Sequence, residues 1–438
     1  LIESHFKSIT LHLHAMGHDV SQHTEEQYNA FLDLLTQLKT LLFPLLKGMV
    51  DSDLEVRRLF ILLDTGFTGV IGLLRDGVLH HEEKLNKLDT EDLREWLLRH
   101  GAAEITAYSP LMQGLYDLVF AYENGEVSKP NFAAGTAIRC IFRICFTYKG
   151  AIFWKMQAGM GDTIFTPLHQ VLAQRGVEFK FFHRVKNLGV KVSANGEKSI
   201  ETISIGRQAT VKDGKAYDPY VNIQNLPCWP STPNFDQLVE GETLKNDNIN
   251  LESFYTPWQD VEEITLHSGK DFDDVLYGAS LATIPYHCSE LISADSNWKA
   301  AVDKVGTVRT MAFQIWLNKD LQELGWKKES PVMDAFVEPM NTWADMTHLL
   351  PRENWPASSN IRNIAYFCGP MEGGIAPASQ TDEPSKALDH VIAESNRFLN
   401  NDIKAFWPQS VDAGGAFDWN SIVRKFDRAN IDPTERYV

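Results

Sequence analysis

Two glycines separated by one residue, Gly159 and Gly161, stand where the chain can bring its backbone close to another group. Glycine has no Cβ, so such a turn tolerates a left-handed φ or a close approach. Asp162 and Thr163 follow directly, and both residue types can cap a helix by accepting hydrogen bonds from free backbone N–H groups. The turn is therefore either part of a cofactor site or a tight loop between packed elements.

The residues after this turn predict a helix and then a strand. Pro167 is tolerated only in a first turn, so the helix should begin between Thr163 and Thr166. Gly176 is the expected left-handed stop, and from Val177 the apolar residues alternate as they do in a strand. One face of the helix is apolar, with Ile164, Phe165, Leu168, Val171 and Leu172.

Neither glycine cluster of the chain is a complete nucleotide motif. A dinucleotide fingerprint needs a third glycine, G-x-G-x-x-G, after a strand, and Ile164 stands at that position. Gly66, Gly69 and Gly72 lie in an apolar run with helical spacing, which predicts close helix packing. The chain has no G-x-x-x-x-G-K-[ST] motif either.

Other residue groups give weaker indications. Neither an acid nor a cysteine completes a metal shell around the clustered histidines near the start, so no metal site is predicted there: His12, His14, His18 and His23. No G-x-S-x-G elbow supports a hydrolase. Four tryptophans could line an apolar cavity, although single tryptophans more often pack in a core: Trp229, Trp258, Trp316 and Trp343.

Composition restricts the possible classes. A chain of 438 residues favours two or three domains, and a net charge of −17 argues against a nucleic-acid partner. No apolar run reaches the ~18 residues that cross a bilayer. The five cysteines are scattered, without a C-x-x-C pair, and fit reduced thiols in the cytoplasm.

Periodicity predicts a mixed α/β or α+β protein with a helical lobe first, over residues 1–150. Strands joined by the turn "ANGE" follow up to residue 212, and residues 213–260 form an ordered excursion rich in turns and aromatics. Further strands are expected in "FDDVLYGASLATIP", "TVRTMAFQIWL", "PVMDAFVEP" and "RNIAYFCGP", and a helix in 384–409. Because the chain begins at Leu1 within a helical pattern and stops at "RANIDPTERYV", we expect a piece of a longer polypeptide.

The stretch "FWKMQAGMGDTIFTPLHQVLAQRGVEFKFFHRV" resembles flavin-dependent oxidoreductases of the amine oxidase and carotenoid (phytoene) desaturase type. The likeness rests on Gly159-Met160 with Phe165, and on Val185 to Leu188 in the following strand. "FDDVLYGASLATIP" is similar to the family strand that returns to the cofactor domain. "TVRTMAFQIWL" and the tail "DRANIDPTERYV" resemble the region before the family's last flavin motif.

The resemblance implies FAD as cofactor and a partial FAD-binding, Rossmann-like domain of the glutathione-reductase type at 151–212. It implies a return strand at 261–290, and at 411–438 a return toward a C-terminal FAD segment. The substrate domain would comprise the helical lobe of 1–150 and a mixed sheet at 291–410. The implied cofactor-binding residues are Gly159, Met160, Gly161, Asp162, Val185 and Gly278.

The sequence departs from the family pattern in three ways. The opening G-x-G-x-x-G and the closing glycine–aspartate motif are both missing, so other chains or segments would have to supply them. The strand "TVRTMAFQIWL" lacks the lysine of many amine oxidases. We therefore expect oxidation or desaturation of a small apolar or amphipathic substrate in the cytoplasm, free or at a membrane surface, with no catalytic residue identified. The alternatives are an amine or amino-acid oxidase, and a non-catalytic interaction subunit that kept the fold and lost the cofactor.

Overall fold

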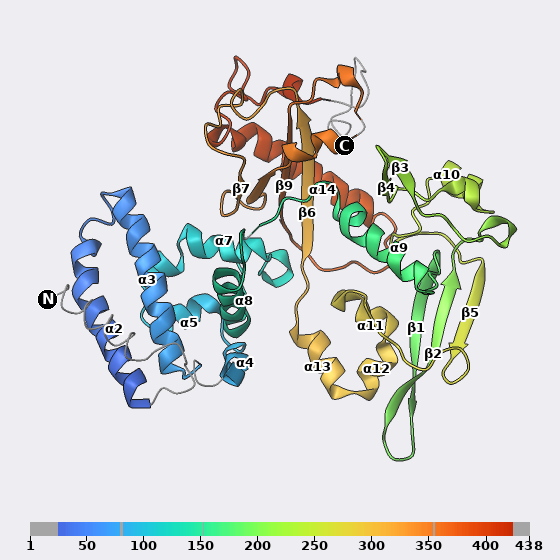
Figure 1. The fold of residues 1–438 in the computed structure, drawn as a ribbon, viewed down its shortest axis with the longest axis horizontal. Coiled ribbons are helices and arrows are strands. Elements are labelled where there is room, and N and C mark those ends of the chain that lie inside the picture. Colours follow the sequence, from blue (N-terminus) through green and yellow to red (C-terminus); the bar gives the residue numbers. More distant parts are fainter. Residues whose placement is uncertain (1–24, 79–81, 152, 354, 424–438) are drawn as a thin grey trace. The chain divides into compact units, whose positions relative to one another are not determined.

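The computed structural model describes residues 25–78, 82–151, 153–353 and 355–423 (Figure 1). The clustered histidines and the tail "DRANIDPTERYV" named above lie outside these ranges. The chain divides into two compact units: unit 1 has residues 1–154, 332–343 and 368–371, and unit 2 has residues 155–331, 344–367 and 372–438. Helices and antiparallel strands are both present, which confirms the predicted mixed α/β class.

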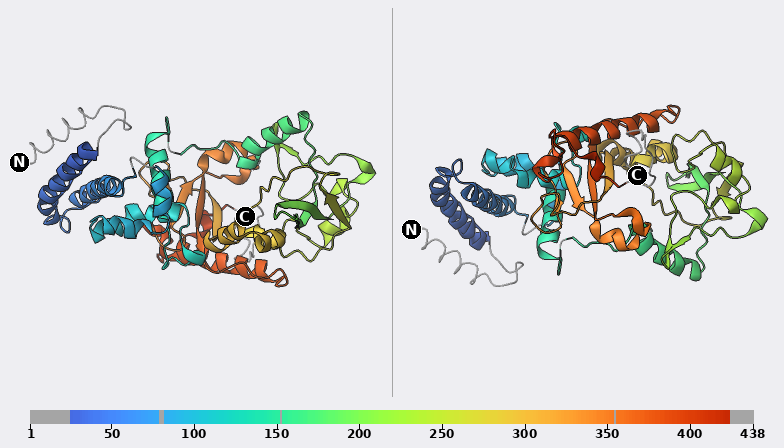
Figure 2. Two further views of the ribbon diagram at one scale, coloured as in Figure 1. Left: turned by 90° about the horizontal axis from the view of Figure 1, so that it is seen from below. Right: turned by 90° about the horizontal axis from the view of Figure 1, so that it is seen from above.

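Unit 1 starts with two long helices, α2 (Glu25–Lys47) and α3 (Leu54–Arg75), which lie side by side (Figures 1 and 2). Asp53 caps α3, because its side chain accepts hydrogen bonds from the backbone N–H groups of Glu55 and Val56. The two helices bury a small apolar cluster around Leu38 and Ile71. Pro44 lies inside α2, which continues to Lys47.

Shorter helices complete unit 1 around the buried rings of Trp96 and Tyr116. Asp92 joins three segments, because its carboxylate accepts from the Arg94 N–H (2.8 Å), the Tyr116 hydroxyl (2.8 Å) and the Phe132 N–H (2.9 Å). The helices are α4 (Leu85–Leu88), α5 (Leu93–Arg99), α6 (Glu104–Ala107), α7 (Pro110–Leu118) and α8 (Ala134–Phe146).

The close helix packing predicted for Gly66, Gly69 and Gly72 is confirmed at one of the three positions. A Cβ on Gly72 would lie 2.5 Å from the Trp96 ring, so only glycine lets α5 approach α3 there. No atom lies within 4 Å of a Cβ built on Gly66 or Gly69, so the prediction is wrong for these two.

Unit 2 opens with the glycine turn, a π-helical turn (Gly161–Phe165) and α9 (Thr166–Gln174). Gly176 has a φ of 91°, which confirms the predicted left-handed stop. The strand expected from Val177 is wrong, because Phe182 turns the chain with a φ of 59° and the strand β1 begins only at His183.

The first sheet of unit 2 has the order β1-β2-β5, with β1 (His183–Val192), β2 (Lys198–Arg207) and β5 (Glu262–His267). Residues 193–197 form the predicted turn between β1 and β2. A connection this short permits only antiparallel pairing, and Val185 lies opposite Ile205 in that register. The sheet therefore differs from the parallel βαβ unit of the Rossmann-like domain that the resemblance implies for 151–212.

Between β2 and β5 lie a small hairpin, β3 (Val221–Ile223) with β4 (Leu226–Cys228), and the helix α10 (Gly241–Asn246). The buried strand predicted at 272–285 is wrong. Residues 273–280 are irregular, and the Leu276 side chain is 99% exposed. A 3-10 turn (Leu281–Thr283) and α11 (Ile284–His287) follow. An apolar run becomes a strand only where another strand pairs with its backbone, and none of the described strands does so here. Two more helices follow, α12 (Ser289–Ala294) and α13 (Ser296–Lys304).

A second sheet has the order β6-β9-β8-β7. The predicted strands in "TVRTMAFQIWL" and "RNIAYFCGP" are confirmed, whereas "PVMDAFVEP" contributes only two residues to the sheet. The strands are β6 (Arg309–Leu317), β7 (Val332–Met333), β8 (Thr342–Asp345) and β9 (Asn363–Met371).

The predicted C-terminal helix is α14 (Glu383–Asn401), which packs on this sheet through aromatic rings. Phe313 stacks on Phe367 at 4.8 Å between ring centroids, and Phe398 of α14 lies 5.1 Å from Phe367. In the part of the chain that the structure describes, no helix has the length and hydrophobicity to cross a membrane.

Candidate functional site

The glycine turn is closed by hydrogen bonds to the Gly159 carbonyl. That oxygen accepts from the backbone N–H groups of Asp162 and Thr163, both at 3.0 Å, and from the Thr163 hydroxyl at 3.1 Å. The π-helical turn follows directly, and such turns are frequent at functional sites. Neither glycine adopts a left-handed φ, so any need for glycine here comes from space rather than from backbone conformation.

Space is limited on both glycines. A Cβ on Gly159 would lie 3.1 Å from Asp162 Oδ2, and one on Gly161 would lie 3.5 Å from Trp229 Cδ1. The second contact is an ordinary one for a methyl group, but a branched side chain at Gly161 would press against the indole ring.

Asp162 does not cap the helix as the sequence suggests. Its Oδ1 accepts instead from the backbone N–H of Trp229 at 2.9 Å. This bond fixes the segment after β4 against the start of the helix. It also brings the Asp162 carboxylate near Cys228, whose pKa is raised by burial first and by Asp162 second.

Five rings from α9, from the segment before β1 and from both sides of the β3–β4 hairpin form what we call the aromatic wall: His169, Phe181, Tyr217, Tyr220 and Trp229. The Trp229 ring lies 5.0 Å from Tyr220 and 5.4 Å from His169, centroid to centroid, at steep angles. Edge-to-face pairs of this kind add to the apolar burial of each ring. The Tyr220 hydroxyl also bonds to His169 Nδ1.

Two polar atoms of the aromatic wall are buried without a described partner, His169 Nε2 and Trp229 Nε1. A buried polar atom normally has a hydrogen-bond partner, and leaving it without one costs free energy. The indole Nε1–H can only donate, so a group bound here would have to present an acceptor. Burial, with a smaller contribution from Asp218, raises the pKa of Tyr220, so this hydroxyl stays protonated at neutral pH.

A cavity of ≈ 670 Å³ adjoins the aromatic wall. Its volume lies within the range typical of small-molecule sites. Phe181, Phe182, Tyr217 and Trp229 supply apolar surface, and the polar groups on its lining include Gln208, Lys245, Asn248, Asn250 and Glu252. A cavity that combines aromatic rings with several polar groups suits a planar or amphipathic molecule.

The structure brings only some of the predicted cofactor residues together. Gly159, Met160, Gly161 and Asp162 share the turn, with the Met160 side chain 57% exposed. Val185 packs among the apolar residues between β1 and the helices α11 and α12. Gly278 lies in the irregular segment after Leu276, with no atom within 4 Å of an added Cβ. No described contact joins Val185 or Gly278 to the turn.

Sequence reasoning named Trp229 as a candidate cavity residue but missed His169 and Tyr220. These two residues are 51 positions apart, so no local pattern relates them. The usable signal was the aromatic and proline-rich composition of residues 217–235, which is unusual for a loop. Of the other tryptophans, Trp343 is buried and Trp258 donates its indole N–H to the Gln208 carbonyl at 2.8 Å.

Unit 1 holds a second polar cluster, around the fully buried Asp117. Its Oδ1 accepts from the Tyr122 hydroxyl and from Gln113 Nε2, and its Oδ2 accepts from the Ala335 N–H at 3.1 Å. Glu338 shares Gln113 as a donor at 3.3 Å. Burial, followed by repulsion from Asp117, raises the pKa of Glu338 to about 7.

Comparison with known proteins adds no relative: neither a protein-family model, nor a curated protein, nor a solved structure matches this chain.

Proposed function

We propose that the chain is an FAD-dependent oxidoreductase, or the large fragment of one, which holds the flavin ring at the aromatic wall. The observation that carries the proposal is Trp229 Nε1, which is buried beside the glycine turn and has no hydrogen-bond partner among the described residues. The isoalloxazine ring is planar and has nitrogen and oxygen acceptors on its edge, which suits stacking on aromatic rings and a bond from an indole N–H. When bound, flavin supplies the redox chemistry, and the protein binds and orients the reactants.

The described residues fit the ring of FAD better than its pyrophosphate. A pyrophosphate is usually bound at a helix N-terminus through free backbone N–H groups. Here the Asp162 carboxylate lies in that first turn and would repel phosphate. The proposal therefore includes a phosphate-binding segment on another chain or another part of the polypeptide.

An exposed apolar face on α9 supports such an additional segment or chain. Amphipathic helices normally bury their apolar face against other protein, so this face has room for a partner. The exposed apolar residues are Leu168, Val171 and Leu172 of α9, with Ile164 and Phe165 of the π-helical turn before it. The same face supports the second candidate function, a non-catalytic interaction subunit that kept the fold and lost the cofactor.

For the substrate we propose a small apolar or amphipathic molecule rather than a primary amine or an amino acid. The side chains of β6 include no lysine; its polar residues are Arg309, Thr310 and Gln314. The aromatic surface of the cavity also favours an apolar ligand. The five free thiols suit the cytoplasm, where we place the protein as part of this proposal.

The absorption spectrum of the natively purified assembly, with any copurifying chains retained, separates the two functions. Bound flavin has bands near about 370 and 450 nm, a property of the cofactor itself. We expect both bands. A colourless assembly that also fails to take up added FAD would refute the oxidoreductase and leave the interaction subunit. Anaerobic bleaching by isoprenoids but not by amines or amino acids would support the proposed substrate class, and the reverse pattern would contradict it.

Gly161→Val tests whether the turn contacts the cofactor. The branched side chain would press on Trp229, so we expect flavin occupancy to fall by about tenfold or more, as for a loss of ~1.4 kcal/mol, while unfolding stability changes less. Gly306→Val is the matched control, because a Cβ there meets open space. Equal losses of flavin in the two variants, or a loss of flavin that only follows a loss of stability, would show that the turn is purely structural.

A further inference from the structure

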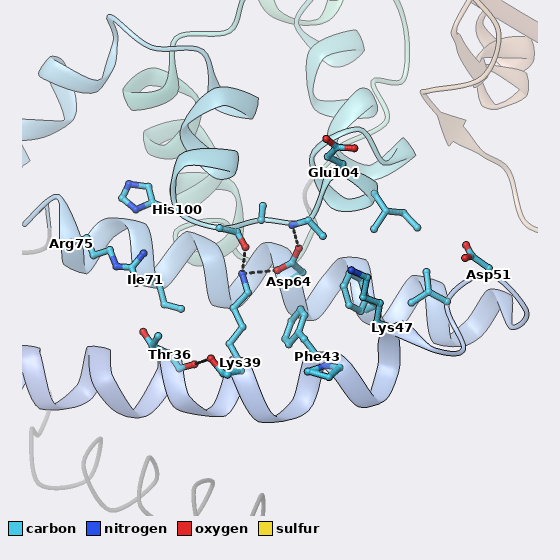
Figure 3. A pocket seen from close by; sticks show the side chains of 18 residues that line it. Thr36, Lys39, Phe43, Lys47, Asp51, Asp64, Ile71, Arg75, His100 and Glu104 are labelled. Carbon is cyan, nitrogen blue, oxygen red and sulfur yellow. Dashed lines mark hydrogen bonds and ion pairs between the residues drawn. The ribbon is translucent and has the colours of Figure 1, made fainter.

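Unit 1 contains a larger cavity than the one beside the aromatic wall. Its volume is ≈ 880 Å³, and it is lined by α2 and the turn after it, by α3, and by residues 100–105 (Figure 3). Phe43, Phe60 and Ile71 contribute apolar surface. The Phe43 and Phe60 rings lie 5.0 Å apart at a steep angle, which gives this wall a defined shape.

The ion pair on the lining is internally satisfied. Lys39 Nζ lies 2.7 Å from Asp64 Oδ1 and donates to the Gly101 carbonyl at 2.7 Å. Asp64 Oδ2 accepts from the Ala103 N–H at 2.8 Å. These groups hold α2, α3 and the segment 100–105 together, and neither charge is free to bind a ligand.

Two cations on the lining have no ion-pair partner among the described residues, Lys47 and Arg75. Figure 3 shows them at opposite ends of the cavity, with Lys39 and Asp64 between them. Asp51 and Glu104 lie on the Lys47 side in the same view, so two carboxylates add negative charge at that end, although Asp51 also pairs with Arg57 at 3.3 Å. At the other end His100 is bonded to Asp76, and the Arg75 guanidinium has no lining carboxylate beside it.

We propose that this cavity binds a long-chain aliphatic carboxylate, with the carboxylate on Arg75 and the chain along Phe43, Phe60 and Ile71. A guanidinium presents parallel N–H donors that match the two oxygens of a carboxylate. The apolar wall removes the chain from water, which is the main source of affinity for such a ligand. The lining residues of this cavity all belong to unit 1, and the aromatic wall belongs to unit 2, so the two proposed sites share no residue.

Isothermal titration calorimetry of the full chain with decanoate, below its micelle concentration, tests the proposal. We expect one saturable site, with affinity falling about fourfold for each methylene removed in the shorter octanoate and hexanoate. Decyltrimethylammonium has the same chain with a positive head and should bind at least tenfold more weakly. Equal binding of the two head groups, or no saturable heat with decanoate, would overturn the proposal.

Charge-reversal variants locate the head group. Arg75→Glu should weaken decanoate binding at least tenfold, and Lys47→Glu should weaken it less. Arg58→Glu is the matched control, because Arg58 is an exposed cation on the same helix that does not line the cavity. All three side chains are exposed, and circular dichroism would verify folding. The same loss in Arg75→Glu and Arg58→Glu would refute the assigned position of the carboxylate.

Discussion

Asp64 is fully buried and forms an ion pair with Lys39. The contribution of this buried pair to the free energy of unfolding can be compared with that of an exposed ion pair on the same helix. Removing one partner of a buried pair leaves an uncompensated charge, which typically costs several kcal/mol. We expect Asp64→Ala to lower the free energy of unfolding by about 3 kcal/mol or more. The control Arg58→Ala breaks the exposed pair with Glu55 and should cost ~0–1 kcal/mol. Urea unfolding of the wild type, Asp64→Ala and Arg58→Ala measures both losses of unfolding free energy. Similar losses in the two variants would contradict a stabilising role for the buried Lys39–Asp64 pair.

Glu338 makes stability depend on pH in a direction that is unusual for a carboxyl group. Its pKa in the fold is raised from 4.5 to about 7, so the folded state favours the protonated form. The stabilisation is fully present below the unfolded pKa and is lost as pH rises toward and through about 7. The side chain in the Glu338→Gln variant cannot ionise, so this variant does not lose that stability as the pH rises.

The measurement is urea unfolding of wild type and Glu338→Gln at pH 5, 6, 7 and 8. Relative to wild type, the variant should gain about 1–3 kcal/mol between pH 5 and pH 8. The exposed Glu95→Gln on α5 is the control and should show no such gain. If the difference in unfolding free energy between Glu338→Gln and wild type stays constant with pH, the Glu338 carboxyl is ionised throughout this range.

At the residue scale, the sequence predicted chemical types better than contacts. Asp162 was expected to cap a helix because of its type and position, and it bonds instead to Trp229, 67 residues away. Thr163 likewise donates to the Gly159 carbonyl rather than accepting from the helix. A local pattern shows that an oxygen is available, but it does not show which distant N–H reaches it first.

At the scale of elements, Gly206 on β2 keeps the sheet close to a buried acid. A Cβ there would lie 2.0 Å from Asp260 Oδ2, which pairs with Arg184 at 2.7 Å and Lys186 at 2.8 Å. Gly206→Ala should therefore displace the acid and cost about 1–3 kcal/mol in unfolding free energy. Chemical denaturation measures this cost.

Gly278→Ala is the matched control for that substitution, because a Cβ there meets open space. Its stability should stay within ~0.5 kcal/mol of wild type. The same variant tests the predicted cofactor role of Gly278, since unchanged flavin occupancy would remove this residue from the site. Equal destabilisation by both alanines would show that Asp260 moves aside at little cost.

Elements with a strong local pattern were the ones that the sequence predicted. The helix α9 has its apolar period and its glycine stop, and the β1–β2 hairpin has its turn residues. The run around Leu276 is equally apolar but is no strand, because strand formation depends on a partner elsewhere in the chain. The aromatic wall was beyond prediction for a similar reason: its rings come from separate elements.

At the scale of the whole molecule, the net charge of −17 should make stability depend on salt. Like charges repel most strongly in the compact state, and added salt screens this repulsion. Raising NaCl from 0.05 to 0.3 M should raise the melting temperature by roughly 1–3 °C, the shift expected for less than about 1 kcal/mol. A scanning calorimetry series measures it. A decrease would mean that attractive ion pairs, such as that of Arg309 with Glu383, outweigh the net repulsion.

The π-helical turn before α9 determines where the chain can lose a residue without changing the alignment of the candidate site. The Thr166 N–H bonds back to the Gly161 carbonyl, five residues earlier, where an α-helix would reach back only four. This wide turn holds one residue more than an α-helical turn, so it can lose one residue while the chain before it keeps nearly the same angle around the helix axis. Deleting one residue from 163–165 should therefore leave Asp162 close to Trp229, whereas deleting one residue within α9 should rotate everything before it by about 100°. Substitution scanning would overlook this difference, which single-residue deletions reveal.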